Sequence, residues 1–149
     1  MTSAAATNSD NNNNKPPARL LVVDDDSDTV RVLALSLLHY GFLVDAFTNA
    51  KDALQEIKSN PDSYSLVLSD SLMPELSGIQ LAKKVKEINP NVKVLLLTGS
   101  EAIDKAASDA PPSTAGIDGF VQKPIATKKL TDKILSLIGE TKGRTYYKD

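Results

Sequence analysis

The sequence predicts an open α/β fold, with five parallel strands and five helices wound on both faces of one sheet. Short apolar runs alternate with longer segments whose apolar residues recur at helical spacing. Few polar residues interrupt the short runs, as expected for strands that are buried on both faces. Right-handed crossovers then favour the strand order 2-1-3-4-5, which opens a crevice at the carboxyl ends of the first and third strands.

The chain of 149 residues has the length of one domain with tails. Residues 1–17 are small and polar with an Asn-rich run, so we predict a disordered tail there, a folded domain over 18–140 and a second tail over 141–149. A hydrophobic content of 41% and a charged content of 24% are enough for an ordinary core.

The composition also excludes several kinds of site. The net charge of -2 gives no reason to expect nucleic-acid or membrane binding. The absence of cysteine excludes disulfides and thiolate metal sites, and His39 alone cannot form a multi-histidine site. The sequence shows no secretory signal and no apolar run of the roughly 20 residues needed to span a bilayer, so we expect a cytoplasmic location.

The first strand is predicted over Arg19–Val23 and leads into an acidic turn. Ser27 or Asp28 can cap the next helix, since both residue types accept hydrogen bonds from a free helix end. That helix is predicted over Thr29–Tyr40 and ends at Gly41.

The next elements follow the same alternation. A strand over Phe42–Phe47 precedes a helix over Ala50–Lys58, which Asn49 can cap. The third strand, Leu66–Leu68, is wholly apolar and leads to a single carboxylate, Asp70. The later elements are a helix from Ser77 or Gly78 to about Ile88, a strand over Lys93–Leu97, a helix over Glu101–Ser108, a strand over Gly119–Gln122 and a helix over Thr127–Ile138.

Carboxylates follow two strands that we expect to be neighbours. Asp24 and Asp25 leave the first strand, and Asp70 leaves the third. Each can simply cap a helix or end a strand, as Asp often does. Because both exits lie at one sheet edge, the three can also share a site, and adjacent carboxylates repel unless a cation relieves them.

Two further strand exits supply complementary groups. Thr98 ends the fourth strand and Lys123 follows the fifth, although each alone is compatible with an ordinary strand end or a surface lysine. Three carboxylates suit a hard cation such as Mg²⁺, with the backbone carbonyl of Leu72 as a further ligand. An Asp nucleophile can accept a phosphoryl group, whose charge the metal and a lysine would offset while a threonine hydroxyl donates a hydrogen bond.

Four segments together resemble the receiver domain of two-component response regulators, which has a flavodoxin-like fold. The segments are LVVDDDSDTV, LVLSDSLMPELSG, VKVLLLTGS and DGFVQKPI, and the resemblance extends from about Ala18 to Glu140.

The resemblance implies a role for each residue of the predicted site. Asp70 would be the phosphoacceptor, and Asp24 and Asp25 would form the acidic pocket, with Asp25 the more direct Mg²⁺ ligand. Thr98 would be the switch hydroxyl and Lys123 the lysine that pairs with the phosphoryl group. Phe120 would be the aromatic switch residue, although plain core packing also explains it, and the peptide bond before Pro124 would be cis.

The sequence also departs from the family pattern. The stretch over 110–116, which contains two prolines, is longer than receivers usually have between the fourth helix and the fifth strand, on the face that these domains commonly use for output. In the family, the positions of Leu72 and Ser100 influence dephosphorylation. Since Leu72 cannot orient an attacking water, we expect slow loss of the phosphoryl group.

The function expected from these residues is that of a stand-alone, chemotaxis-regulator-like response regulator and not of an enzyme. Its phosphodonor would be a sensor histidine kinase or a histidine phosphotransfer protein, and an unidentified partner would read a surface change at the fourth helix, fifth strand and last helix. One alternative is a haloacid dehalogenase-like phosphatase built on Asp24 and Asp26, but it lacks a later acidic pair and leaves Asp70 unexplained. The other is a pseudo-receiver, an interaction domain that is never phosphorylated.

Overall fold

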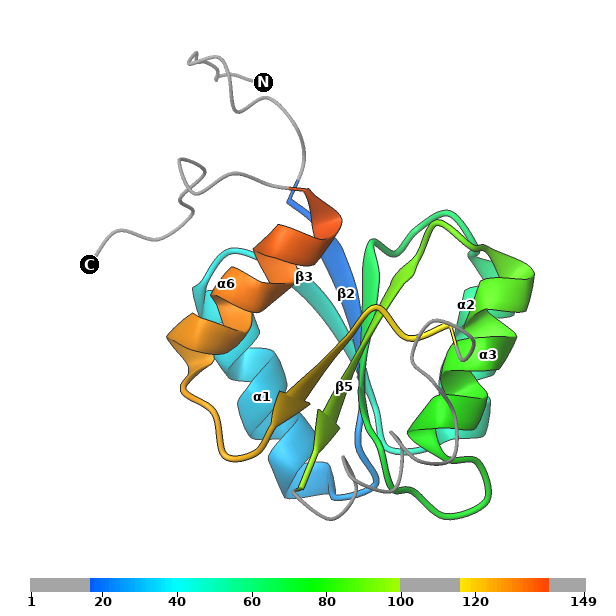
Figure 1. The fold of residues 1–149 in the computed structure, drawn as a ribbon, viewed down its shortest axis with the longest axis horizontal. Helices are drawn as coiled ribbons and strands as arrows, with labels where there is room; N and C mark the ends of the chain where they lie inside the picture. Colours follow the sequence, from blue (N-terminus) through cyan, green and yellow to red (C-terminus); the bar gives the residue numbers. More distant parts are fainter. Residues whose placement is uncertain (1–16, 100–115, 140–149) are drawn as a thin grey trace.

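The computed structural model describes residues 17–99 and 116–139, and Figure 1 shows their fold. The elements are β2 (Arg19–Val23), α1 (Ser27–His39), β3 (Leu43–Phe47), α2 (Ala50–Ser59), β4 (Leu66–Asp70), α3 (Gly78–Ile88), β5 (Lys93–Thr98), β6 (Gly119–Gln122) and α6 (Thr127–Ile138). The helix expected over Glu101–Ser108, the stretch over 110–115, residues 1–16 and residues 140–149 lie outside the described residues.

The five strands form one parallel sheet in the order β3-β2-β4-β5-β6. Counted along the chain, this is the predicted order 2-1-3-4-5, and the predicted α/β class is confirmed. The register pairs Leu68 with Val22 on one side and with Leu95 on the other, so β4 lies at the centre of the sheet. The ends of β2, β4 and β5 therefore meet at one edge.

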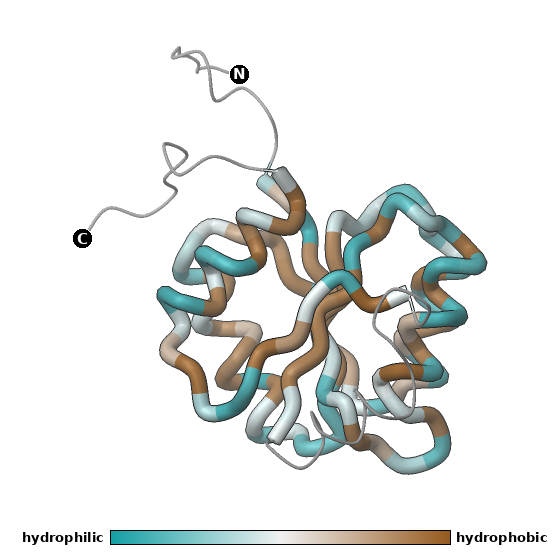
Figure 2. The backbone as a smooth tube through the Cα atoms, viewed as in Figure 1, coloured by the Kyte–Doolittle hydropathy of each residue, from teal (hydrophilic) through white to brown (hydrophobic). Residues whose placement is uncertain are grey.

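Two helical layers cover the sheet (Figure 1): α1 and α6 lie on one face and α2 and α3 on the other. Because side chains alternate along a strand, each strand contributes to both layers. Leu66 and Leu68 pack in the core under α1 and α6, whereas Val67 packs in the core under α2 and α3. Figure 2 shows that the strands are mostly hydrophobic, whereas hydrophobic and hydrophilic residues alternate along the helices on either side.

The start of α1 differs from the prediction. The helix begins at Ser27 instead of Thr29, and its N-cap is Asp26, not Ser27 or Asp28. The Asp26 carboxylate accepts hydrogen bonds from the Asp28 backbone N–H at 3.3 Å and from the Thr29 hydroxyl at 2.6 Å. These contacts satisfy the first turn two residues earlier than expected.

The other boundaries differ by a few residues. Strand β4 continues past Leu68 to Asp70, because its backbone stays paired with β5 as far as Leu97. The predicted strand over Phe42–Phe47 begins one residue later, at Leu43. The predictions for β2, β6 and α6 match the structure.

Within the two described ranges, the helices are too short and too polar for any of them to cross a lipid bilayer.

Candidate functional site

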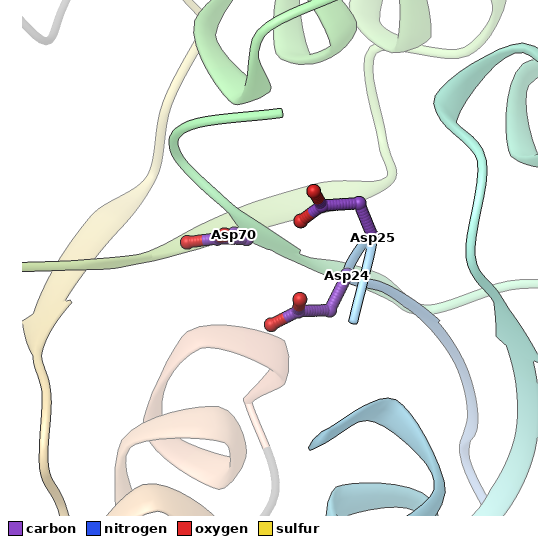
Figure 3. A group of neighbouring side chains, drawn as sticks. All are labelled: Asp24, Asp25 and Asp70. Atoms are coloured by element: carbon purple, nitrogen blue, oxygen red, sulfur yellow. The ribbon is translucent and has the colours of Figure 1, made fainter. Parts of the chain in front are cut away.

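The three predicted carboxylates come together at the carboxyl edge of the sheet (Figure 3). One carboxylate oxygen from each of Asp24, Asp25 and Asp70 lies within 4.8 Å of the others. Asp24 and Asp25 follow β2, and Asp70 is the last residue of the adjacent strand β4. Pairing of the two strands as far as Val23 and Ser69 sets this arrangement, because it brings both exits to the same level.

Asp24 is the buried member of the acidic cluster, with only 3% of its surface exposed. Its Oδ1 atom accepts a hydrogen bond from the Asp26 backbone N–H at 2.9 Å, while its Oδ2 atom is buried without a partner in the described structure. Burial raises the pKa of Asp24, and the negative charges of Asp70 and Asp25 raise it further, against the Asp26 N–H and the Lys123 charge. A cation bound at this position would offset the burial of Asp24 and the neighbouring negative charges, and would so stabilise its carboxylate form.

Asp70 also forms an ion pair with a lysine. The Lys123 ammonium lies 3.1 Å from Asp70 Oδ1, and the Asp70 side chain is 14% exposed against 40% for Lys123. The backbone fixes this approach, because the Lys123 N–H donates to the Thr98 carbonyl at 2.7 Å just after β6 ends. The peptide bond between Lys123 and Pro124 is cis.

Two hydroxyl groups near Asp70 are buried and make no hydrogen bond. Thr98, the last residue of β5, is fully buried, and Ser71, which follows Asp70, is 4% exposed. Neither Oγ atom has a partner among the described residues. A buried hydroxyl without a partner is costly, so both are suited to a ligand that supplies one. Sequence reasoning selected Thr98 and missed Ser71, whose burial depends on packing around the loop.

This donor set fits a divalent cation with a preference for oxygen. Asp24, Asp25 and Asp70 offer carboxylate oxygens, and the unpartnered Oδ2 of Asp24 is the observation that favours a bound ion. When bound, Mg²⁺ would supply positive charge beside Asp70, in addition to that of the Lys123 ammonium. The predicted backbone ligand, the Leu72 carbonyl, lies two residues after Asp70, and the Leu72 side chain is 64% exposed.

Phe120 lies on β6 opposite Leu96 and is half-buried. Its ring packs against the core under α2 and α3. It belongs to the same layer as Leu96, two residues before Thr98 on β5. The position is compatible with both interpretations made from the sequence, core packing and a switch.

Gly78 shapes the site in a way that the sequence analysis did not recognise. A Cβ atom there would lie 2.5 Å from the Asp70 carbonyl oxygen and 2.9 Å from Ser71 Cα. The first turn of α3 therefore rests directly on the backbone of Asp70. The sequence shows Gly78 eight residues after Asp70, and we interpreted this glycine only as the start of a helix.

The fold and this acidic pocket define a class of protein, the phosphorelay receivers, and comparison with known families agrees. Residues 20–135 match the family model described as the response regulator receiver domain. The chain therefore belongs to the response regulator receiver domain family, whose members act in two-component signalling.

Two curated relatives illustrate the range of the family. The chain is 32% identical over 112 residues to the response regulator receiver protein CpdR of Brucella abortus, covering 75% of this chain and 89% of that one. It is 28% identical over 106 residues to the transcriptional regulatory protein QseB of Haemophilus influenzae, covering 71% of this chain but 46% of that one. The chain thus spans most of CpdR and about half of QseB.

The solved structures share the fold. A response regulator receiver domain protein from Clostridium thermocellum superposes with a TM-score of 0.76 at 28% identity, covering 82% of this chain and 94% of that one.

Proposed function

We propose that the chain is a phosphoacceptor module in which Asp70 receives a phosphoryl group with the help of Mg²⁺. The observation that carries this proposal is the convergence of three carboxylates within 4.8 Å, with the Lys123 ammonium 3.1 Å from Asp70. We assign the folded module to residues 18–140, with Asp24, Asp25, Asp70 and the Leu72 carbonyl as the metal ligands.

In the transfer, an Asp70 carboxylate oxygen attacks phosphorus. A new O–P bond forms as the donor's N–P or O–P bond breaks, and the leaving group keeps the bonding electrons. Lys123 offsets charge on the transferred oxygens, and the Thr98 hydroxyl, which has no partner in the described structure, donates a hydrogen bond to one of them. The donor we propose is a sensor histidine kinase or a histidine phosphotransfer protein.

The output would follow from the movement of two residues. Thr98 moves toward the phosphoryl group and Phe120 turns into the space that this leaves, which shifts the population between two packings. The surface affected is that of β6 and α6, together with the helix expected over Glu101–Ser108. An unidentified partner protein reads this surface, and the module acts in the cytoplasm.

Incubation with acetyl phosphate and Mg²⁺, followed by intact mass measurement, tests the phosphoacceptor. The wild type should gain one phosphoryl adduct, and Asp70→Asn should gain none. An adduct that survives in Asp70→Asn would place the acceptor elsewhere. A wild type that forms no adduct with any donor would instead favour the pseudo-receiver, the interaction domain that is never phosphorylated.

A further inference from the structure

The loop between β4 and α3, residues 71–77, is closed at its base. The Gly78 N–H donates to the Ser71 carbonyl at 3.0 Å, and the Ser71 N–H donates to the Leu97 carbonyl of β5 at 3.0 Å. Both ends of the loop are thereby fixed to the sheet beside Asp70. The loop carries Leu72, so its shape decides where that backbone carbonyl lies.

Two apolar side chains pull the loop back toward the core. Met73 and Leu76 both pack against the core under α2 and α3. Only Pro74 and Glu75 separate them, and the chain reverses there in a three-residue turn closed by a 2.7 Å hydrogen bond from the Leu76 N–H to the Pro74 carbonyl. At the centre of this turn, Glu75 adopts a strained φ of 70°, the one positive φ of a non-glycine residue in the described ranges.

The Glu75 side chain reaches across to another element. Its Oε1 atom lies 3.6 Å from the Lys51 ammonium, in the first turn of α2. A small opening lies between the loop over 71–77 and the start of α2. It is lined by Asp25, by Thr48, Asn49 and Ala50 before and at the start of α2, and by Met73, Pro74 and Glu75 of the loop. The ion pair therefore connects the loop with the start of α2 beside an opening that Asp25, a predicted metal ligand, also lines.

We infer that Glu75 is a positioning residue, which holds the loop over 71–77 against the acidic cluster through its ion pair with Lys51, at a turn whose positive φ the surroundings impose. Backbone strain at one residue persists only where the surroundings enforce it, and here Met73, Leu76 and the closed base do so. This inference rests on the proposed Mg²⁺ site and adds a residue that touches neither metal nor phosphate.

The size of the effect follows from the exposure of the ion pair. The side chains of Lys51 and Glu75 are 70% and 57% exposed, so water screens their attraction. Loss of the pair should weaken Mg²⁺ binding by about two- to fivefold, the range of an exposed ion pair. Glycine at position 75 removes the ion pair and also accepts a positive φ without strain.

Calorimetric Mg²⁺ titration and thermal unfolding without metal, on the same full-length variants, test this inference. We expect Glu75→Gly to bind Mg²⁺ about two- to fivefold more weakly while its melting temperature stays the same or rises. Lys51→Ala should show a similar loss of affinity, and the double variant should lose no more than Glu75→Gly alone. Lys58→Ala, at an exposed lysine of the same helix, is the matched control and should bind as the wild type does.

Three results would overturn the inference. Glu75→Gly and Lys51→Ala that bind Mg²⁺ as tightly as the wild type would remove the role of Glu75 and leave the metal site intact. A melting temperature of Glu75→Gly that falls along with affinity would show general loosening of the fold. A wild type that binds no Mg²⁺ would remove the metal site itself, together with any role in positioning it.

Discussion

At the scale of single residues, Asp24 matters because it is a buried carboxyl group beside two other carboxyl groups. Its pKa is raised above the ordinary value of 3.8, so the native state holds this proton more tightly than the unfolded chain does. The free energy of unfolding of the metal-free protein should therefore fall as pH rises from 3.8 through the higher native pKa. Urea unfolding in a chelator at several pH values should show this contribution, and Asp24→Asn should lack it and be more stable at neutral pH.

Mg²⁺ should reverse the effect of the Asp24 substitution. The wild type should gain stability with added Mg²⁺, because a ligand that binds only the native state stabilises it. Asp24→Asn and the exposed counterpart Asp25→Asn should both lose this gain. An equal Mg²⁺ gain in Asp24→Asn would show that Asp24 is not part of the metal site.

Leu72 is expected to set how long Asp70 stays phosphorylated. Its side chain is 64% exposed beside the site and has no polar group to orient water. Leu72→Asn should speed loss of the phosphoryl group by up to about tenfold, the effect expected of one hydrogen bond that orients the attacking water. Adduct decay followed by intact mass after removal of the donor measures this, and Leu72→Met is an apolar control. Equal decay rates in Leu72→Asn and wild type would refute the role.

At the scale of elements, the junction between β4 and α3 depends on close contact of two backbones. Gly78→Ala would place a methyl group 2.5 Å from the Asp70 carbonyl oxygen, and neither backbone can yield easily. We expect a loss of about 1–3 kcal/mol in the free energy of unfolding, as for overpacking elsewhere. Gly99→Ala is the stability control, since a Cβ there meets no atom of the described residues within 4 Å. Equal denaturation midpoints for the two variants would contradict the contact.

The elements also show which features the sequence can predict. The helix over Thr127–Ile138 was placed correctly because its apolar spacing is regular and Gly139 follows it in the left-handed conformation. The start of α1 was not, because the acidic turn offers several capping residues and the choice depends on geometry. Local patterns predict an element well and its first residue less well.

The same contrast applies to the site. The residues that leave the strands were predicted, since parallel order alone brings Asp24, Asp25, Asp70 and Lys123 to one edge. The unpartnered hydroxyl of Ser71 and the strained φ of Glu75 were not, because both follow from how the loop packs on the core. Sequence order predicts which groups meet, whereas packing decides how they are held.

At the scale of the whole molecule, a groove that includes Lys123 is where we expect the proposed protein phosphodonor to dock. It runs from Lys123 along α1 and the start of α6, and it is lined by Val32, Leu33, Ile125 and Leu130 among others. Val32 is 63% exposed, so Val32→Glu should not disturb the fold. We expect this variant to accept phosphate at least tenfold more slowly from a histidine phosphotransfer protein that phosphorylates the wild type, since an unpaired charge would be buried on docking.

Acetyl phosphate provides the control for Val32→Glu, because a small donor needs no docking surface. Labelling from acetyl phosphate should proceed at the wild-type rate, and the ratio of the two rates isolates docking from chemistry. A variant slowed equally with both donors would have a damaged pocket, and one slowed with neither would exclude this groove as the donor surface.

The division of the molecule into two separately packed layers has a consequence for signalling. Leu68, two residues before Asp70, belongs to the layer of α1 and α6, and Leu96, two residues before Thr98, belongs to the layer of α2 and α3. A phosphoryl group attached to Asp70 and hydrogen-bonded by Thr98, as proposed above, would contact residues of both layers. We therefore expect its effect to extend to both faces of the sheet, where two different partners would have access to it.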